Sequence, residues 1–550
     1  MNCKMFGLFL LSVTTFSFGN TCSQKNSALN YPALNAQAME ESAKPIRPGV
    51  PGKQPFWNTH ARQFIYAPAF NFNPVKGAAR YRFTATSKTD NKDYVFTASE
   101  PWAALSPIWR ELPVGPVVLT VQGLDNQGVE VDLFCQGRKF YRGAVFKGPY
   151  HKAVMDYRES AHQALEYLFK EKYIKRWVED GQPDQSYDLY CYPSKVIGAV
   201  IRAMNMYSKL SPADAKEALL IAQRAAEYLI SISEPAGAPL EYFTPTYSRK
   251  DYGYSPEWNQ AAERNKDKLM VAYAAEAATA FLDLYDTTKD DKFLAAAKRI
   301  ADTYVKLQMP CGTWPAMVEV KTGTPTAKNL CMPTMWIIPF LERLVEQYGM
   351  DEYKTAKEKA FGWVMENPMK TFNWEGQFED QFLSPDYENL TGIDACYHAV
   401  YLLKHNKDNP EYVKQAEELI RFAEDQFVVW ANIMPAEYQR RKTLGYDNYL
   451  LPCALEQYYY MDAIGAVAAI IIKAYQKAYE VTGIELYIAK ACELANSMTV
   501  AQERNGKFAP GRYPTIWRKE YTSKDFIWVN CLAMDAEAMI SLAKVLEGRK

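Results

Sequence analysis

The sequence predicts a multidomain α and β protein, with an N-terminal β-sandwich followed by an (α/α)6 toroid of about twelve helices. Hydrophobic residues alternate in short runs up to about residue 148 and then recur at helical spacing. Similar amphipathic helices return about every 60 to 75 residues in the second region, which indicates a repeated two-helix unit. The length of 550 residues also exceeds what one ordinary core needs.

The first 25 residues have the pattern of a secretory signal peptide. Lys4 provides a basic start, residues 6–18 form an apolar run too short to span a bilayer, and residues 17–19 form a small-x-small cleavage pattern. We therefore expect a secreted or periplasmic protein. A lipid anchor at Cys22 is the less favoured alternative, because residues 19–21 are a poor lipoprotein processing site.

Charge and motif content exclude several classes of function. With 63 Lys and Arg against 64 Asp and Glu, the chain has no excess of positive charge for nucleic acid, and no membrane span is expected. The ten cysteines and five histidines show no metal-ligand spacing, and nucleotide-binding glycine motifs are missing. We expect no cofactor and no metal, with calcium left open. Cys311 and Cys331 flank one loop and are the pair to test for a disulfide.

Residues 26–58 are expected to be a linker, because a Pro- and Gly-rich stretch occupies 44–55. Residues 59–148 are expected to form the β-sandwich from the runs FIYAPAFNF, ARYRFTAT, DYVFTAS, PVVLTVQGLD and VEVDLFC. This region resembles a fibronectin type III or similar immunoglobulin-like module. Such modules seldom carry out chemistry, so we expect the active site in the helical domain.

Residues 149–550 are expected to form the helical toroid. Several segments share an early aromatic residue and Ala or Leu at helical spacing, for example DKFLAAAKRIADTYVKLQ and EYVKQAEELIRFAEDQFV. The expected helices are 152–178, 193–209, 212–232, 266–287, 290–308, 330–348, 351–367, 390–406, 410–429, 455–481, 484–499 and 529–547.

Very short links between these helices alternate with long loops. In a ring of alternating up and down helices, the long loops all fall at one rim, and loops of this length are commonly functional. The sequence therefore predicts an active site at that rim. The long loops are 233–265, 309–329, 368–389, 430–454 and 500–528.

This arrangement resembles the six-hairpin glycosidase superfamily over about 400 residues. The resemblance implies a carbohydrate cleft at the loop end of the toroid. The superfamily includes glycoside hydrolases, unsaturated-uronide hydrolases and related polysaccharide lyases, so the architecture alone does not select a reaction.

The 368–389 loop is the strongest local signal for chemistry. Glycoside cleavage uses two carboxyl groups about 5 to 9.5 Å apart, one as acid and one as base or nucleophile. Glu379 with Glu388 is the preferred catalytic pair, and Asp380 is the substitute. The alternative is that the acidic residues cap the helix at Leu390. The loop's aromatic and acidic residues are Trp374, Glu375, Glu379, Asp380, Asp386, Tyr387 and Glu388.

Aromatic residues in the long loops are typical of a sugar-binding surface, because pyranose rings pack on aromatic faces. The alternative is that they pin the loops onto helix ends. Asp394 and His398 lie four residues apart and are expected to share a helix face, either for proton transfer or as a structural pair. The expected substrate-binding residues are Glu241, Tyr242, Tyr247, Tyr254, Trp314, Trp374, Tyr387, His398, Arg512 and Trp517, with Trp258, Tyr446 and Asp447 on the same rim.

The favoured hypothesis is a glycoside hydrolase. A cluster of basic loop residues would suit a uronic acid, which points to a glucuronidase-like substrate. The first alternative is a polysaccharide lyase or uronate C5-epimerase, in which Tyr247, Tyr254 and His398 would act. The second is a non-catalytic glycan-binding protein. Oligomeric state is left open. The basic loop residues are Arg249, Lys250, Arg512, Arg518 and Lys519.

Overall fold

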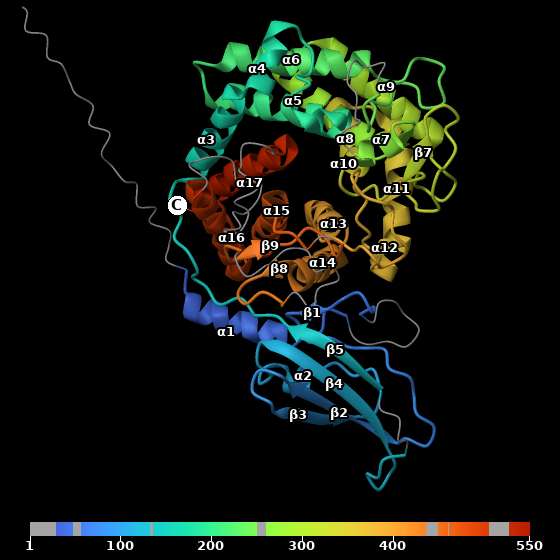
Figure 1. Cartoon of the computed structure of the whole chain (residues 1–550), viewed down its shortest axis with the longest axis vertical. Helices are drawn as coiled ribbons and strands as arrows, with labels where there is room; N and C mark the ends of the chain where they lie inside the picture. Colours follow the sequence, from blue (N-terminus) through green and yellow to red (C-terminus); the bar gives the residue numbers. More distant parts are fainter. Residues whose placement is uncertain are drawn as a thin grey trace, which may run out of the picture.

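A computed structural model describes residues 29–47, 57–131, 136–249, 260–435, 449–459, 461–504 and 527–549. A small sheet lies against one side of a ring of helices (Figure 1). The expected signal peptide and Cys22 lie outside the described residues. Among the described helices, none combines the length and apolarity needed to cross a bilayer.

The sheet in the described residues has five strands in the order β1-β5-β4-β2-β3. Neighbours are antiparallel except for β1 with β5. Side chains along β2 and β4 alternate between buried and partly exposed, so one face of the sheet is buried. The strands are β1(Gln63–Phe64), β2(Arg80–Ser87), β3(Asp93–Ala98), β4(Gly115–Leu124) and β5(Gln136–Arg142).

The two facing sheets of the expected sandwich are not clearly seen in the described residues. The run at 64–72 contains only the second residue of β1 and one isolated bridge at Ala69, and otherwise continues as coil around Pro68. Its aromatic rings instead cover the buried face, where Phe64 and Phe70 contact Phe140 at ring-centroid distances of 5.7 Å each. Trp109 of the short helix α2(Ser106–Trp109) adds a third contact to Phe140.

A helix, α1(Tyr31–Ser42), occupies part of the expected linker. Asn30 caps its start, Pro32 lies in its first turn, and Leu34 and Ala38 are buried. The helix lies between the sheet and the ring (Figure 1). Its apolar face is narrow and rich in alanine, so its periodicity is weak in the sequence.

Among the described residues, six inner helices form the ring and each packs against an outer helix. The last inner helix packs on the first outer helix, which closes the circle. The inner helices are α5(Pro193–Leu210), α8(Tyr273–Thr288), α10(Ile337–Tyr348), α13(Ile393–Lys404), α15(Gly465–Thr482) and α17(Val529–Gly548). Their outer partners, in the same order, are α6(Ala215–Ser231), α9(Asp291–Leu307), α11(Lys354–Glu366), α14(Glu411–Phe427), α16(Glu485–Arg504) and α3(Tyr157–Lys170).

The expected helices overlap the observed ones, but three inner helices begin later than expected and one segment is divided. α8 begins at Tyr273 rather than 266, α10 at Ile337 rather than 330, and α15 at Gly465 rather than 455. The segment expected as a single helix at 152–178 is broken at Glu171 into α3 and α4(Lys172–Glu179). Short and long connections alternate as expected. The small elements lie in these connections, all but one of them in the long ones; the exception, at 351–353, is in the short link between α10 and α11. The small elements are η1(Asp188–Cys191), α7(Gln260–Asn265), β6(Lys268–Met270), β7(Met317–Glu319), η3(Asp351–Tyr353), α12(Pro368–Thr371), β8(Val428–Val429) and β9(Cys453–Ala454).

Buried polar contacts join the sheet to the ring. Asp425 of α14 accepts hydrogen bonds from the backbone N–H groups of Ile65 and Tyr66, at 2.5 and 2.7 Å. Next to it, Glu424 forms an ion pair with Lys490 of α16 at 2.7 Å, and both side chains are 2% exposed. A charge buried this deeply is unfavourable without its partner, so the loss of either residue should destabilise this contact between the sheet and the ring.

The loop after α9 contains a position that only glycine fits. Gly312 has φ +103°, and an added Cβ would lie well inside contact distance of the Lys359 carbonyl oxygen. We expect Gly312→Ala to lower the free energy of unfolding by about 3 kcal/mol, from backbone strain plus overpacking. Gly349→Ala is the control, because that left-handed glycine has open space around it and should cost only about 1 kcal/mol. Equal losses in urea unfolding would refute the steric account.

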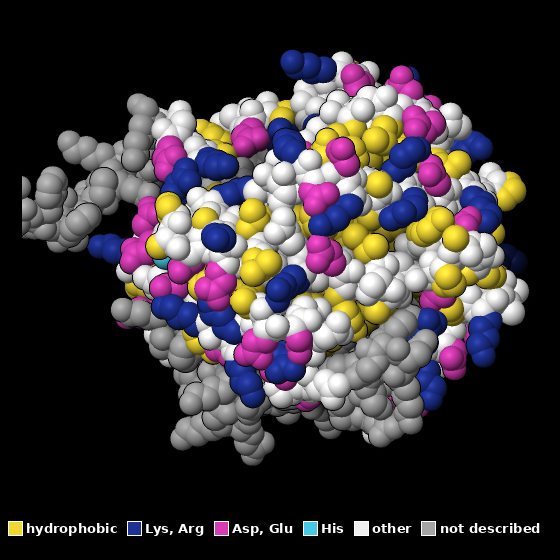
Figure 2. Space-filling view, turned by 90° about the horizontal axis from the view of Figure 1, so that it is seen from above, with side chains coloured by type: hydrophobic (Ala, Val, Ile, Leu, Met, Phe, Trp, Pro, Cys, Tyr) yellow, Lys and Arg dark blue, Asp and Glu magenta, His cyan; other side chains and the backbone are white. Residues whose placement is uncertain are grey.

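The surface seen in Figure 2 has cationic and anionic side chains interspersed over it. No broad region of one sign is visible on the described part of that face. A phosphate backbone requires concentrated positive charge. This surface therefore offers no support for nucleic-acid binding.

Candidate functional site

A pocket that is partly open to solvent lies at the centre of the ring. The first turn of each of the six inner helices, or the residues leading into it, contributes to the lining. The inner helices therefore point their N-termini at the pocket, and their dipoles favour negative charge there. The polar and aromatic lining residues are Lys195, Tyr273, Glu276, Trp336, Gln377, Phe378, Asp380, Asp394, Glu456, Trp528 and Asn530.

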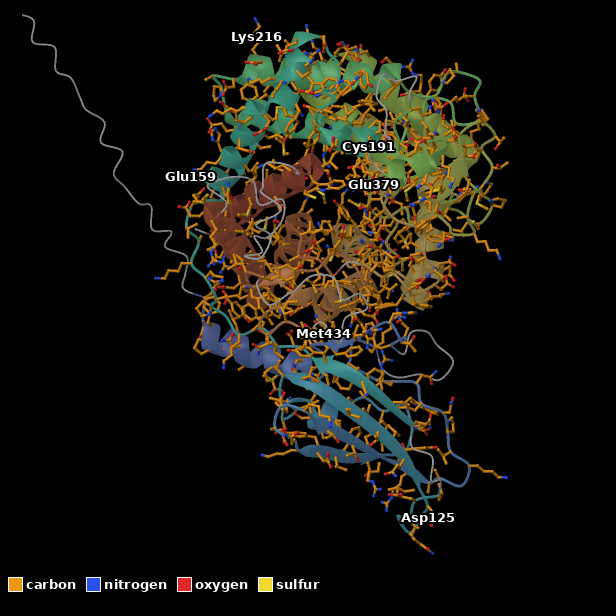
Figure 3. The ribbon with its side chains drawn as sticks, viewed as in Figure 1. Asp125, Glu159, Cys191, Lys216, Glu379 and Met434 are labelled. Atoms are coloured by element: carbon orange, nitrogen blue, oxygen red, sulfur yellow. The ribbon has the colours of Figure 1, made fainter. Side chains whose placement is uncertain are left out.

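Glu379 lies beneath the pocket surface rather than in its lining. Its carboxylate forms an ion pair with Lys195 at 2.6 Å and accepts a hydrogen bond from the Tyr273 hydroxyl at 2.5 Å. Tyr247 donates to the Glu379 carbonyl oxygen at 3.0 Å. The side chain is fully buried and lies inside the ring near Cys191 (Figure 3). Glu379 thus anchors its loop to α5 and α8.

Asp380, the next residue, lines the pocket. Burial opposes the charge on Lys195, but Glu379 and Asp380 outweigh burial and raise the pKa of the Lys195 ammonium. The same attraction favours the ionised form of Asp380. The Lys195 ammonium also lies 5.0 Å from the centre of the Trp528 ring, which holds it at the pocket wall.

Asp394 also lines the pocket, in the first turn of α13. Burial raises the pKa of its carboxyl to about 7, although hydrogen bonds from the Thr334 hydroxyl and the Met335 backbone act in the opposite direction. Asp394 therefore holds a proton for a substantial fraction of the time near neutral pH.

The expected contact between Asp394 and His398 is replaced by other partners. Asp394 bonds Thr334 at 2.6 Å, whereas His398 packs between Phe361 and Trp374 at 5.8 Å each. Burial lowers the pKa of His398 to about 3, so the imidazole stays neutral. His398 is 1% exposed and is not among the lining residues, so its interpretation as a substrate-binding residue is not supported by its position.

Glu276 of α8 is a lining residue that the sequence analysis missed. It is 3% exposed, and burial raises the pKa of its carboxyl to about 8 despite the opposing charges of Lys195 and Arg202. Its Oε2 atom is buried without a hydrogen-bond partner among the described residues. The available signal was one glutamate in the otherwise apolar run AYAAEAATAF.

Two long loops are tied together beside the pocket. Asn329 donates to both carboxylate oxygens of Glu375, at 2.9 and 3.0 Å. Gln377 donates to the Leu330 carbonyl at 2.7 Å and accepts from the Met332 backbone at 3.0 Å. These contacts fix the segment that carries Asp380.

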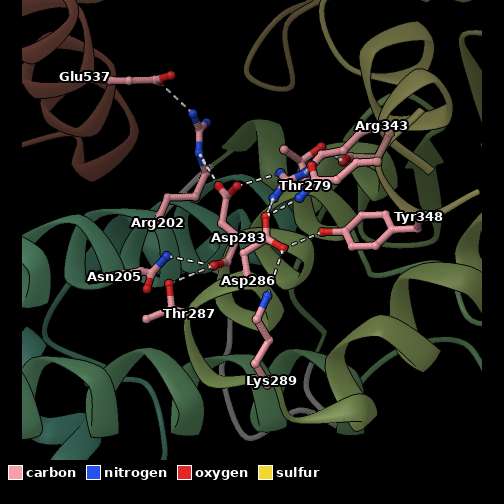
Figure 4. Close-up of polar contacts among 12 residues, drawn as sticks. Arg202, Asn205, Thr279, Asp283, Asp286, Thr287, Lys289, Arg343, Tyr348 and Glu537 are labelled. Atoms are coloured by element: carbon pink, nitrogen blue, oxygen red, sulfur yellow. Dashed lines mark hydrogen bonds and ion pairs between the residues drawn. The ribbon is translucent and has the colours of Figure 1, made fainter. Parts of the chain in front are cut away.

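Below the pocket, an ion-pair network links five inner helices, and Figure 4 shows its part around Arg202, Asp283 and Arg343. Arg202 pairs with Glu537 at 2.8 Å, and Glu537 also pairs with Lys473 at 2.9 Å. Burial opposes ionisation of Glu537, but the two cations lower its pKa to about 2. Asp283 joins Arg202 to Arg343, at 3.6 and 2.6 Å. The network gives the pocket a charged, rigid base.

The other expected site residues lie away from the pocket lining. Trp314 and Trp374 are fully buried, with the Trp314 indole donating to the Tyr304 carbonyl at 2.8 Å. These two rings pin loops, which corrects their interpretation as sugar platforms. Glu388 is half-buried in a turn. Glu241 pairs with Lys306, and Arg299 lies over the Tyr242 ring. Tyr387 donates to the Thr371 carbonyl oxygen, and Arg249 pairs with Glu234.

Several expected rim residues cannot be placed. Tyr254, Arg512 and Trp517 lie outside the described residues, as do Lys250, Trp258, Tyr446, Asp447, Arg518 and Lys519. Cys311 and Cys331, the pair named for a disulfide test, are both free cysteines, one exposed and one buried.

One set of side chains in the described residues has metal-ligand spacing, namely Glu342, Glu346 and His405. Lys404 lies 2.8 Å from each glutamate and supplies positive charge to them. His405 contacts Glu342 and Asp408. These contacts satisfy the carboxylates as an ion-pair cluster.

No family model and no curated protein matched the chain. Solved structures of similar fold were found. The chain is similar to a family 76 glycoside hydrolase from a bovine Bacteroides thetaiotaomicron strain (9% identity, 85% of this chain and 94% of that one, TM-score 0.46). It is also similar to an unsaturated glucuronyl hydrolase specific for heparin (11% identity, 71% of this chain and 98% of that one, TM-score 0.44). A third similar structure is that of cellobiose 2-epimerase from Spirochaeta thermophila (11% identity, 71% of this chain and 98% of that one, TM-score 0.47).

A glycoside hydrolase and an unsaturated glucuronyl hydrolase are among the kinds of enzyme that the resemblance to the six-hairpin glycosidase superfamily implied, whereas a cellobiose epimerase was not named. They carry out different reactions, and all three TM-scores are below 0.5. The similarities therefore select no reaction for this chain.

Proposed function

We propose that the chain is a glycoside hydrolase whose active site is the pocket at the centre of the ring. One observation carries the proposal: the pocket contains two carboxyl groups in opposite environments. Asp380 lies in the field of the Lys195 ammonium, which favours its charge, whereas burial favours the protonated form of Asp394. A pair separated in this way provides a base and an acid at the same pH.

In this mechanism, Asp394 donates its proton to the glycosidic oxygen as the bond to the anomeric carbon breaks. Asp380 either activates a water molecule or attacks the anomeric carbon, and water supplies the final hydroxyl group. Lys195 supplies a positive charge that attracts Asp380. The inner-helix N-termini stabilise the negative charge that remains on Asp394 after proton transfer.

The pocket also has suitable surfaces for a sugar ring. Trp336, Phe378 and Trp528 contribute aromatic lining, and the C–H faces of a pyranose pack on aromatic faces. Gln377 and Asn530 add amide groups for hydroxyl recognition.

Hydrolysis is favoured over the lyase and epimerase alternatives. Those reactions need a base for the C5 proton and a group that neutralises the uronate. Tyr273 donates its hydroxyl to Glu379, and burial together with Glu379 raises its pKa well above the usual value. Lys195 is already paired with Glu379. Tyr273 and Lys195 are thus both engaged by Glu379, so neither is free to act as the base or to neutralise a uronate.

The test is product analysis after incubation with a panel of neutral and acidic glycans in H₂¹⁸O. Hydrolysis should place one ¹⁸O atom in each new reducing end. A product with an ultraviolet-absorbing double bond would indicate a lyase, and binding without turnover would indicate a glycan-binding protein. Export through residues 1–25 stays a prediction, checked by N-terminal sequencing of the exported chain.

The proposed acid predicts a pH dependence. The pKa of Asp394 is raised to about 7 in the free protein, so kcat/KM should fall as pH rises through 7 and the acid loses its proton. Asp394→Asn should lower kcat about 100-fold or more and remove this alkaline limb. The measurement is a kcat/KM profile from pH 4 to 9. An unchanged profile in the variant would exclude Asp394 as the acid.

A further inference from the structure

Glu276 is a buried carboxyl group in the pocket lining with an unused hydrogen-bonding atom. The side chain is 3% exposed and lies in the first turn of α8. Its Oε2 atom has no partner among the described residues. A buried polar atom without a partner is costly, so such an atom beside a pocket points to a ligand.

Both cations near Glu276 are engaged by other groups. Lys195 is paired with Glu379 at 2.6 Å, and Arg202 is paired with Glu537 at 2.8 Å. Their combined attraction is smaller than the effect of burial, so Glu276 retains its proton at neutral pH. A protonated carboxyl is a hydrogen-bond donor, which a carboxylate is not.

The charge of the lining limits the substrate. The described lining includes the acidic residues Glu276, Asp380, Asp394 and Glu456, whereas Lys195 is its one basic residue. The field of the helix N-termini and of Lys195 already acts on Asp380 and Glu379, so a uronate would add a negative charge that no further described cation of the lining offsets. Uncompensated buried charge is strongly unfavourable. Arg249, one of the basic residues that suggested a uronic acid, pairs with Glu234 at 3.1 Å instead.

We propose that Glu276 donates a hydrogen bond to a hydroxyl group of the bound sugar and that the pocket selects an uncharged glycosyl unit over a uronate. The inference rests on the proposed function for the location of the substrate. Its chemistry is independent of which residue cleaves the bond, because it concerns recognition.

The test measures binding of neutral hexoses and matching hexuronic acids by calorimetry, and hydrolysis of the matching 4-nitrophenyl glycosides. At least one neutral hexose should bind about 10-fold or more tightly than its uronic acid. Glu276→Ala should weaken that binding, and raise KM, about 10-fold, while kcat changes less than about 3-fold. Glu276→Gln, which keeps a donor, should bind within about 3-fold of the parent at pH 6.

A pH series separates this role from a structural one. Affinity for the hexose should fall as pH rises through about 8 in an Asp394→Asn background, and Glu276→Gln should remove this fall. The Asp394 change removes the other group titrating nearby. The charged or titratable groups that interact with Glu276 are Lys195 and Arg202 from α5, Tyr273 from its own helix, Glu379 from the neighbouring loop and Tyr397 from α13.

Tighter binding of the uronic acid, unchanged affinity in Glu276→Ala with a normal melting temperature, or the same pH series in Glu276→Gln would each overturn the inference. Stronger binding of a 2-amino sugar that Glu276→Gln abolishes would also contradict a donor role. If Asp380→Asn leaves turnover intact while Glu276→Ala weakens binding, the proposed catalytic pair fails and this inference stands.

Discussion

Asp380→Asn should reduce kcat about 1000-fold or more on any glycan that the parent protein cleaves, with KM within a few-fold. The substitution keeps the size of the side chain but removes the charge that either activates water or attacks the anomeric carbon. Asp380 lines the pocket and its side chain is exposed, so the variant should fold normally. The measurement is steady-state kinetics together with thermal unfolding.

Asp386→Asn is the matched control in the same loop. Asp386 is exposed, lies outside the pocket lining and bonds Asn373 at 3.2 Å. Its activity should stay within about 2-fold of the parent. Glu379→Gln should behave differently from both, because it leaves Lys195 buried without its partner and lowers stability as well as activity. Normal kcat in Asp380→Asn would exclude its catalytic role.

Lys490→Met should lower the free energy of unfolding by about 3 to 5 kcal/mol, since removing one partner of a buried ion pair leaves the other charge uncompensated. Lys490 and Glu424 are each 2% exposed and lie 2.7 Å apart. Glu424 also accepts from the Trp430 indole at 2.9 Å and from Tyr66, so the damage should reach the joint between the sheet and the ring. Urea unfolding followed by tryptophan fluorescence gives the value.

Lys170→Met is the control for this prediction. Lys170 pairs with Glu166 on the same outer helix, but its side chain is 64% exposed. A solvated pair within one helix contributes at most about 0.5 kcal/mol. Similar losses in the two variants would show that burial of the Glu424–Lys490 pair is unimportant for stability.

Most of the ring could be predicted from the sequence. Inner helices such as GAVAAIIIKAYQ are apolar on all sides, and outer helices such as DKFLAAAKRIADTYVKLQ are amphipathic, so the two kinds could be told apart and ordered. The narrow apolar face of α1 and the irregular segment after β1 gave weaker signals. There the observed structure depends on packing against Phe140 and the ring, which local patterns do not report.

The site could be predicted only in part. The crowded carboxylates at 375–388 identified the loop that carries Asp380. They could not show that Glu379 forms an ion pair with Lys195, because that contact joins residues 184 positions apart in the sequence. Glu276 and Asp394 could not be ranked as site residues from the sequence for the same reason. They line the pocket only because six helix N-termini, distant in the sequence, meet at one point. Trp314 and Trp374 resemble sugar-binding residues in the sequence and differ only in their complete burial.

The most direct test of the central claim is a crystal structure of Asp380→Asn with an uncleaved oligosaccharide from the glycan panel. We expect the glycosidic oxygen within hydrogen-bonding distance of Asp394, the substituted residue 380 beside the anomeric carbon, and Trp336 or Trp528 against a sugar face. A sugar bound elsewhere on the ring, with the central pocket empty, would contradict the assignment of this pocket as the active site.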